Sequence, residues 1–355
     1  MNYPIVFADK HHTGLAESLR LLVEVRLKGT LLFPIGEEWA TEGYWLIHKP
    51  YNYAKSTVKQ FLSLDQEYKH PDGTPPMNKI TGGNSEYYEV FDEHHQQINK
   101  HVTLEQFKQL PVDIVIASIP DHVEPYKRLI KNFHPEAKFV FQMGNMFNEI
   151  LSNLHEIPNL LSSTIDFKVP PTCNAVFYHQ EFSLDIFKPT GIKPEKKITS
   201  FIIDLPKTGH GNMFYTMKSI MPEYEFKSYG AGCDNGVVTG VQNIANIMNS
   251  SYFGFHAKYG GDGFGHLLYN WFACGKPIIT CFRDYSDKLG AELLTDMETC
   301  IDLNQHSVEN TCEIIRNLTP EKYSYMSQQC YNRFKEKVDY NKEEQEIRVF
   351  LSKLR

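Results

Sequence analysis

The sequence has few cysteines, and they lack the spacing that marks a metal or redox site. Its seven cysteines include no Cys-x-x-Cys pair, their number is odd, and their spacings are irregular. Zinc sites and disulfide frameworks in short motifs depend on paired thiols. We therefore expect reduced thiols and no metal ligands, as is usual in a cytoplasmic protein.

Long apolar runs and an excess of positive charge are also missing. No apolar stretch approaches the roughly 18 residues of a membrane-spanning helix. A signal peptide has an apolar core shortly after its first residues. In this sequence a strand-like run stands at that place instead. The formal net charge of −7 disfavours a broad surface for nucleic acid or anionic lipid. We expect no transmembrane segment and a cytoplasmic location.

The length and the order of short apolar runs indicate two α/β domains. A chain of 355 residues exceeds one usual core. In the first half, a helix expected over 15–28 separates two buried strands, which makes a β-α-β unit. The segment 37–110 has no clear period and is interpreted as an insert suited to acceptor recognition. The strands expected in this half cover 5–8, 30–34, 113–118, 138–142, 164–169 and 177–178.

A second α/β domain begins after a linker at 182–194, which contains three Pro or Gly breakers. The domains are expected at 1–185 and 186–340, with a final helix at 341–355. Two Rossmann-like α/β domains facing each other across a cleft are the predicted fold. The strands expected in the second half cover 198–203, 225–229, 252–256, 277–280 and 299–303.

The stretch 260–279 organises the second half. It begins as a glycine-rich loop, continues as an apolar helix and ends in a β-branched strand. Glycines let the backbone approach a ligand closely. The helix start behind them offers free N–H groups and the positive end of a dipole, which suits a phosphate.

This stretch resembles the donor-site signature of GT-B glycosyltransferases, most closely the retaining family-4 group. That signature reads Glu-Gly-Phe-Gly, a second Glu, and Ala-x-Ala-Cys-Gly-x-Pro-Val-Ile. Asp262 stands at the first acidic position, Phe264 and Gly265 match, and 273–278 match closely. Asn270 replaces the second Glu, which contacts the donor ribose in the family, so its amide would make such hydrogen bonds without charge.

The resemblance implies transfer of a sugar from a nucleotide diphosphate sugar to an acceptor hydroxyl. A UDP-sugar donor is favoured, a GDP-sugar is an alternative, and no other cofactor is implied. GT-B enzymes generally stabilise the leaving diphosphate without an obligatory metal, and the chain has no Asp-x-Asp motif. The resemblance also makes 1–185 the acceptor domain, 186–340 the donor domain, and 341–355 a helix that packs back on the first domain.

Several residues are candidates for binding the donor. Lys207 and Lys258 could contact the diphosphate, and solvated surface lysines are the alternative. Asp262 is expected to face the sugar, or else to form an ordinary turn. Asn270 is expected at the ribose, or else is a polar residue on an apolar helix. The other donor-side candidates are Gly209, Gly211, Asn212, Tyr229, Gly261, Phe264 and Gly265.

Two histidines are candidates for the acceptor side. His12 lies in the first β-α loop, where inverting GT-B enzymes carry a general base, and an imidazole has a suitable pKa. His122 follows the strand at 113–118, near where retaining relatives have a histidine that touches the sugar. The similarity to family 4 favours a retaining transfer, and Asn270 and His12 leave inversion possible.

Other functions also stay open. A phage-type glycosyltransferase acting on modified DNA bases shares the fold, and so does a non-catalytic nucleotide-sugar-binding relative. A non-hydrolysing sugar-nucleotide epimerase is a further alternative. The acceptor could be a glycan, a small molecule or modified nucleic acid, and the sequence does not define the oligomeric state.

Overall fold

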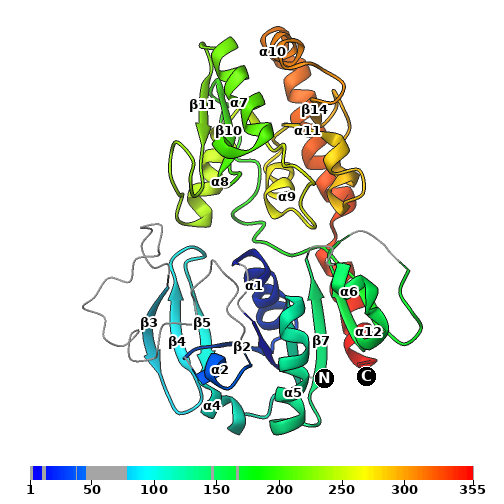
Figure 1. The fold of residues 1–355 in the computed structure, drawn as a ribbon. Coiled ribbons are helices and arrows are strands. Elements are labelled where there is room, and N and C mark those ends of the chain that lie inside the picture. Colours follow the sequence, from blue (N-terminus) through cyan, green and yellow to red (C-terminus); the bar gives the residue numbers. More distant parts are fainter. Residues whose placement is uncertain are drawn as a thin grey trace. The chain divides into compact units, whose positions relative to one another are not determined.

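Short strands alternate with helices in two α/β units, each built on its own sheet (Figure 1). The first unit comprises Met1–Phe182 and Tyr340–Arg355, and the second comprises Ser183–Asp339. The computed structural model describes residues 3–9, 13–36, 38–44, 78–144, 148–164 and 168–354.

The sheet of the first unit has a parallel core and an antiparallel extension. Its described strands pair in the order β3-β4-β5-β2-β1-β6-β7-β8-β9. All pairs from β5 to β9 are parallel. β6 is buried along its whole length, as expected for a continuous Ile/Val run covered on both faces. The parallel core strands are β1 (Ile5–Ala8), β2 (Thr30–Pro34), β6 (Ile114–Ala117), β7 (Lys138–Met143), β8 (Asn159–Ser162) and β9 (Asn174–Phe177).

The strand expected at 164–169 is wrong. Its described residues lie in no strand, and β8 occupies Asn159–Ser162 instead. The polar first residue hides this strand, because Asn159 is fully buried and its amide donates to the Phe139 carbonyl at 2.8 Å. That hydrogen bond depends on the neighbouring strand and leaves no local pattern.

The insert at 37–110 extends the sheet where it is described. β4 pairs antiparallel with β3 and β5, and β5 runs parallel to β2. The period is hard to read because Asn99 and His101, both polar, lie buried in β5. The elements are α2 (Glu38–Thr41), β3 (Asn78–Gly83), β4 (Tyr88–Asp92), β5 (Gln97–Val102) and α4 (Leu104–Gln109).

Helices and aromatic side chains cover this sheet. The helix expected at 15–28 is divided into α1 (Thr13–Arg20) and a π-helical segment, η1 (Leu21–Arg26). On the other side, the Phe7 ring stacks on Trp39 with centroids 4.8 Å apart. The remaining elements are η3 (Pro120–His122), α5 (Val123–Phe133), α6 (Asn148–Ser152), η4 (Leu154–Glu156) and α12 (Tyr340–Ser352).

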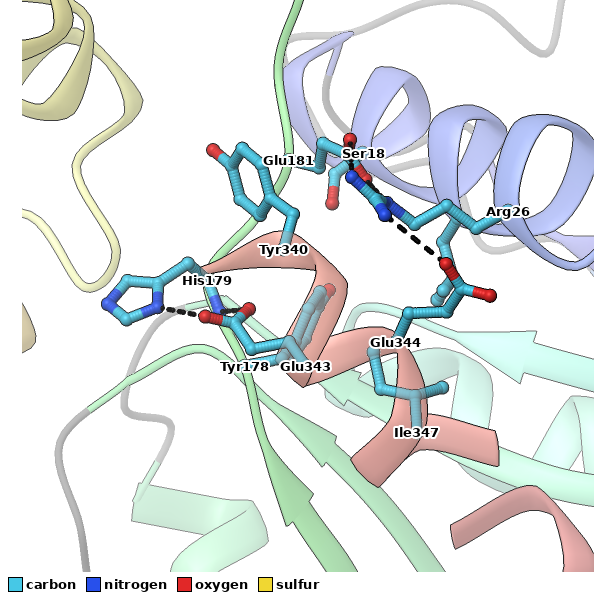
Figure 2. Close-up of a pocket in the computed structure, with 10 residues that line it drawn as sticks. Ser18, Arg26, Tyr178, His179, Glu181, Tyr340, Glu343, Glu344 and Ile347 are labelled. Carbon is cyan, nitrogen blue, oxygen red and sulfur yellow. Dashed lines mark hydrogen bonds and ion pairs between the residues drawn. The ribbon is translucent and has the colours of Figure 1, made fainter. Parts of the chain in front are cut away.

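The last helix, α12, is held on the first unit by charged and polar contacts around a shallow pocket. Figure 2 shows Arg26 of η1 between Glu181 and Glu344, with His179 against Glu343. The Glu343 carboxylate accepts from the His179 backbone at 2.8 Å and lies 2.7 Å from its ring. These pairs fix the start of α12, and its later apolar residues join the core.

The sheet of the second unit is parallel throughout, in the order β11-β10-β12-β13-β14. Its strands are β10 (Lys197–Ser200), β11 (Glu225–Ser228), β12 (Phe253–Phe255), β13 (Ile278–Thr280) and β14 (Cys300–Asp302). Its helices are α7 (Gly209–Ile220), α8 (Val241–Ser250), α9 (His266–Ala273), α10 (Val308–Asn317) and α11 (Pro320–Lys337). Short 3-10 turns are η5 (Leu205–Lys207), η6 (Phe282–Asp284) and η7 (Leu289–Leu293).

The helix α9 is the buried element of this unit. Every residue from Leu268 to Ala273 is buried. The Trp271 ring lies over β12, where a Cβ at Gly254 would come within 2.6 Å of its Cε2 atom. Glycine at 254 is therefore needed for the helix to approach the sheet closely. None of the helices in the described parts of the chain has the length and apolar character that a bilayer crossing requires.

Lys276 is a buried lysine just after α9, with 6% of its surface exposed. Burial lowers its pKa from 10.5 to about 8, and the nearby Cys274 opposes this only in part. Below pH 8 the folded state therefore holds a charge that burial disfavours. Between these two pKa values the unfolded chain binds more protons, so stability rises with pH.

We expect Lys276→Met to raise the free energy of unfolding at pH 7 by on the order of 3 kcal/mol, with a smaller gain at pH 10. Urea unfolding at both pH values measures this. Lys188→Met, at an exposed position of the same unit, is the control and should change little. A loss of stability in Lys276→Met at pH 7 would contradict the expectation.

Candidate functional site

Because the second sheet is parallel, the loops after its strands emerge at one edge, its carboxyl edge. The loop after β10 leads to Lys207, Gly209 and Asn212, and Tyr229 follows β11 directly. Residues 258–265 form the loop after β12. The topology thus brings the expected donor-side residues to the edge where open α/β sheets bind ligands.

The glycine-rich loop turns sharply into α9. Gly261 and Gly265 have φ of +66° and +76°, a region that other residues rarely adopt. A Cβ at Gly261 would also lie 2.3 Å from the Asp284 carbonyl oxygen. Gly265 is the N-cap of α9, and no side chain caps the helix. The first turn of α9 therefore directs the positive end of the helix dipole at this loop, which suits an anion.

Asp262 lies between two basic side chains. Its carboxylate pairs with the Lys258 ammonium, and its Oδ2 lies 3.3 Å from Nε2 of the buried His256. Burial would raise the pKa of Asp262, but the attraction of His256 and Lys258 outweighs it and holds that pKa well below the ordinary value. Asp262 is therefore ionised and accepts hydrogen bonds. Its low pKa also makes it a weak base. The His256 contact has ion-pair distance without hydrogen-bond alignment.

Two expected residues near α9 differ in what their side chains contact. Asn270 is 7% exposed, and its Oδ1 has no hydrogen-bond partner among the described residues. An unpaired buried carbonyl costs stability, so it marks a position where a ligand hydroxyl could donate. Phe264 is 2% exposed and stacks on Tyr269 with ring centroids 4.4 Å apart, so its ring packs inside the unit.

The expected residues around α7 are more exposed. Lys207 is 75% exposed, and its ammonium lies 2.7 Å from Oδ1 of Asp204. Gly209 opens α7, and the Thr208 hydroxyl caps the helix by accepting from Gly211 N–H at 2.9 Å. Asn212 lies exposed in the first turn. Lys207 is paired with Asp204 in the folded chain, so a phosphate bound here would compete with Asp204 for it.

Apolar surface lies along the same edge. The Tyr229 ring stacks on Phe201 with centroids 5.5 Å apart. Ile203, in the loop after β10, is 57% exposed, and Tyr259, in the loop after β12, is 84% exposed. Exposed apolar side chains beside polar loops are a common feature of ligand-binding surfaces.

A further cluster at this edge has no counterpart in the sequence motifs. His210, Cys281 and Asp284 bring one ligand-type atom each to within 4.8 Å of one another. Nε2 of His210 lies 3.1 Å from Oδ2 of Asp284. Burial, together with the charges of Asp284 and Asp302, raises the pKa of the Cys281 thiol to about 12. No local spacing signals this group, because His210 follows β10 whereas Cys281 and Asp284 follow β13.

In the first unit, His122 belongs to a buried polar group at the end of β6. It is 1% exposed, and its Nδ1 lies 2.9 Å from Oδ2 of Asp9, which follows β1. The same oxygen accepts from the Ser118 backbone at 2.8 Å. Asp9 thus holds the tautomer with hydrogen on Nδ1. The sequence pattern missed Asp9 as a partner, and His12 lies outside the described residues.

No protein-family model matches the sequence, and no curated protein matches it. Solved structures do match. A glycosyltransferase from Rickettsia africae ESF-5 is 12% identical, with 99% of each chain covered and a TM-score of 0.59. HepE from Anabaena in complex with UDP is 10% identical, with 99% of this chain and 100% of that chain covered and a TM-score of 0.62. An alpha-glucosyltransferase in complex with UDP-glucose and DNA containing an abasic site is 11% identical, with 99% of each chain covered and a TM-score of 0.61.

The chain has the GT-B fold. The prediction of two Rossmann-like α/β domains is therefore confirmed. All three solved structures are glycosyltransferases, in agreement with the activity that the sequence resemblance implies, and at this identity the likeness establishes the GT-B fold alone.

The lowered pKa of Asp262 predicts a pH-dependent contribution to stability. The ionised carboxylate stabilises the folded state above its ordinary pKa of 3.8, and this stability is lost as pH falls below that value. Asp262→Asn removes the titrating group. We expect wild type to be more stable than Asp262→Asn by on the order of 2 kcal/mol at pH 6, with a smaller difference at pH 3.

Chemical unfolding of both proteins across this pH range measures the difference. Asp287→Asn, whose carboxylate is 67% exposed, serves as the control and should follow the wild-type curve. A constant difference between wild type and Asp262→Asn at all pH values would contradict the pairing with His256 and Lys258.

Proposed function

We propose that this protein is a glycosyltransferase that moves a sugar from a UDP-sugar to an acceptor hydroxyl. In this proposal Ser183–Asp339 binds the donor and the first unit binds the acceptor. The GT-B fold supports it, and the observation that carries it is the unpaired, buried Oδ1 of Asn270 beside the glycine-rich loop. A fold by itself hosts many activities, so the residues at the edge carry the argument.

The Asn270 oxygen fits a ribose hydroxyl. A buried oxygen without a donor costs about 1–3 kcal/mol, and a ligand hydroxyl that donates to it recovers that cost. Asn270 lies one turn into α9, so a nucleotide at the start of this helix would place its ribose near the amide. The amide supports the hydrogen bond that the family makes with a carboxylate.

The diphosphate is assigned to backbone N–H groups more than to lysines. Gly265 leaves the start of α9 without a side-chain cap, and α7 begins at the same edge with Gly209. Both helix starts offer donors and a positive dipole end to developing charge on the leaving group. Lys258 and Lys207 already pair with carboxylates, so each adds less charge than a free lysine would.

Asp262 is assigned to the sugar. An aspartate that stays ionised accepts hydrogen bonds from sugar hydroxyls and stabilises positive charge that develops on the sugar ring. Its low pKa makes it a poor general base, so the proton of the acceptor goes elsewhere. The exposed Ile203 and the Tyr229 ring offer apolar contacts for the base of the nucleotide.

The donor assignment predicts selective binding of UDP. We expect UDP to raise the melting temperature more than GDP, ADP or TDP, because a ligand bound only by the folded state stabilises it. HepE and the alpha-glucosyltransferase, which share the fold, were solved with UDP and UDP-glucose. No shift with any of the four nucleotides would overturn the proposal. Release of UDP from a UDP-sugar without acceptor would exclude a non-catalytic binding protein.

The Asn270 assignment predicts that substituting this residue lowers the affinity for UDP without lowering the stability of the folded protein. We expect Asn270→Ala to weaken UDP binding roughly tenfold with little loss of stability, because its oxygen has no partner in the folded chain. Asn249→Ala is the matched control. Asn249 is a buried helical asparagine of the same unit whose amide donates to the Lys188 and Ala245 carbonyls. It should lose stability and keep its UDP affinity, as measured by calorimetry and urea unfolding. Equal UDP affinity in Asn270→Ala and wild type would contradict the role.

We further propose retention of the anomeric configuration, which the likeness to family 4 supports. NMR of the first-formed product should show the same anomeric configuration as the donor sugar. An inverted product would instead favour a general base on the acceptor side, for which His12 is the candidate.

Transfer to modified DNA is the second candidate. The alpha-glucosyltransferase of the same fold was solved with DNA, which favours it. The net charge of −7 counts against a strong phosphate grip. Retention on DNA that falls steeply with added salt would support this acceptor, and passage through a DNA column at low salt would exclude it.

A further inference from the structure

The three residues His210, Cys281 and Asp284 form a cluster at the carboxyl edge of the second sheet, and the proposed donor site assigns no role to their side chains. His210 lies in the first turn of α7, Cys281 follows β13, and Asp284 ends η6. Their ligand-type atoms lie within 4.8 Å of one another. We propose that this cluster is a binding site for a divalent transition-metal ion, with zinc as the ion that its nitrogen, sulfur and oxygen donors fit best.

The donor set suits zinc. Zinc accepts imidazole nitrogen, thiolate sulfur and carboxylate oxygen at about 2.0–2.3 Å in a tetrahedral arrangement. Two atoms bound to one such ion lie roughly 3.3–3.8 Å apart, so these side chains need to close by at most about 1.5 Å. The His210 nitrogen and the Asp284 oxygen, 3.1 Å apart, already have nearly this spacing. A hard ion such as magnesium would take oxygen ligands and would not select the thiol.

The surroundings hold the ligands in place and leave one coordination position to an outside group. The Gly260 backbone donates to Oδ1 of Asp284 at 3.2 Å, which directs Oδ2 toward His210. Such outer hydrogen bonds orient metal ligands in proteins. Cys281 is 1% exposed, and its thiol makes no hydrogen bond to any described residue. Three protein ligands leave the fourth tetrahedral position for water or a ligand.

The carboxylates near Cys281 favour a bound cation. Asp284, and Asp302 beyond it, place negative charge near Cys281. A divalent cation would compensate this negative charge and stabilise a bound thiolate. The ion proposed here is resident in the protein and distinct from a magnesium that accompanies a nucleotide, so the site does not depend on the proposed donor function.

Cobalt(II) binding to the untagged full chain, after removal of metals with a chelator, tests the site. Cobalt takes the place of zinc, and a cobalt–thiolate bond gives a charge-transfer band in the near ultraviolet. We expect the band to saturate at one ion per chain and to disappear when zinc displaces cobalt. Cys281→Ser should abolish the band, and His210→Gln and Asp284→Asn should weaken cobalt binding roughly tenfold or more.

Cys233→Ser is the matched control, because Cys233 lies at the same edge but its thiol donates to the Ile202 carbonyl. It should keep the wild-type band. Far-ultraviolet circular dichroism and thermal unfolding establish that each variant is folded. Absence of the band in wild type, or its survival in folded Cys281→Ser, would overturn the proposal. Because no nucleotide is present, failure here is separate from failure to bind UDP.

Discussion

The close packing of α9 on β12 is the constraint on which the second unit depends. The Trp271 ring lies over Gly254, and any larger residue there would collide with it. This contact holds the helix start, and with it the glycine-rich loop, at the carboxyl edge of the sheet. Phe264 supports the same arrangement from the loop by stacking on Tyr269. An anion-binding helix start needs such a rigid base, because its N–H groups must keep their direction.

Charge at this edge is largely balanced within the protein. Asp262 is paired with Lys258 and His256, and Lys207 is paired with Asp204. In the proposed function, a negatively charged donor would therefore meet helix N–H groups and an unpaired amide oxygen more than a free basic patch. The consequence is specificity through hydrogen bonding, with less long-range attraction, which agrees with a net charge of −7.

The first unit has a different polar architecture. Asp9, Ser118 and His122 form a buried group at the end of its parallel strands. One carboxylate oxygen of Asp9 contacts both the Ser118 backbone N–H and the His122 ring. The C-terminal helix α12 closes this unit through Arg26 and His179, far from it in sequence. Residues from both ends of the chain thus stabilise one core, which makes the last helix part of the first unit.

The sequence by itself determined the fold class and the central loop–helix–strand stretch, because buried parallel strands and an apolar helix leave continuous apolar runs. It did not reveal β8 or the period of β5, where Asn159, Asn99 and His101 are buried among residues distant in sequence. The pairing of Asp262 with His256 and the cluster of His210, Cys281 and Asp284 were decided only by the tertiary structure. Parallel strand pairing brings the ends of β10, β12 and β13 to one edge of the sheet. The spacing of these residues along the chain does not predict that they lie close together.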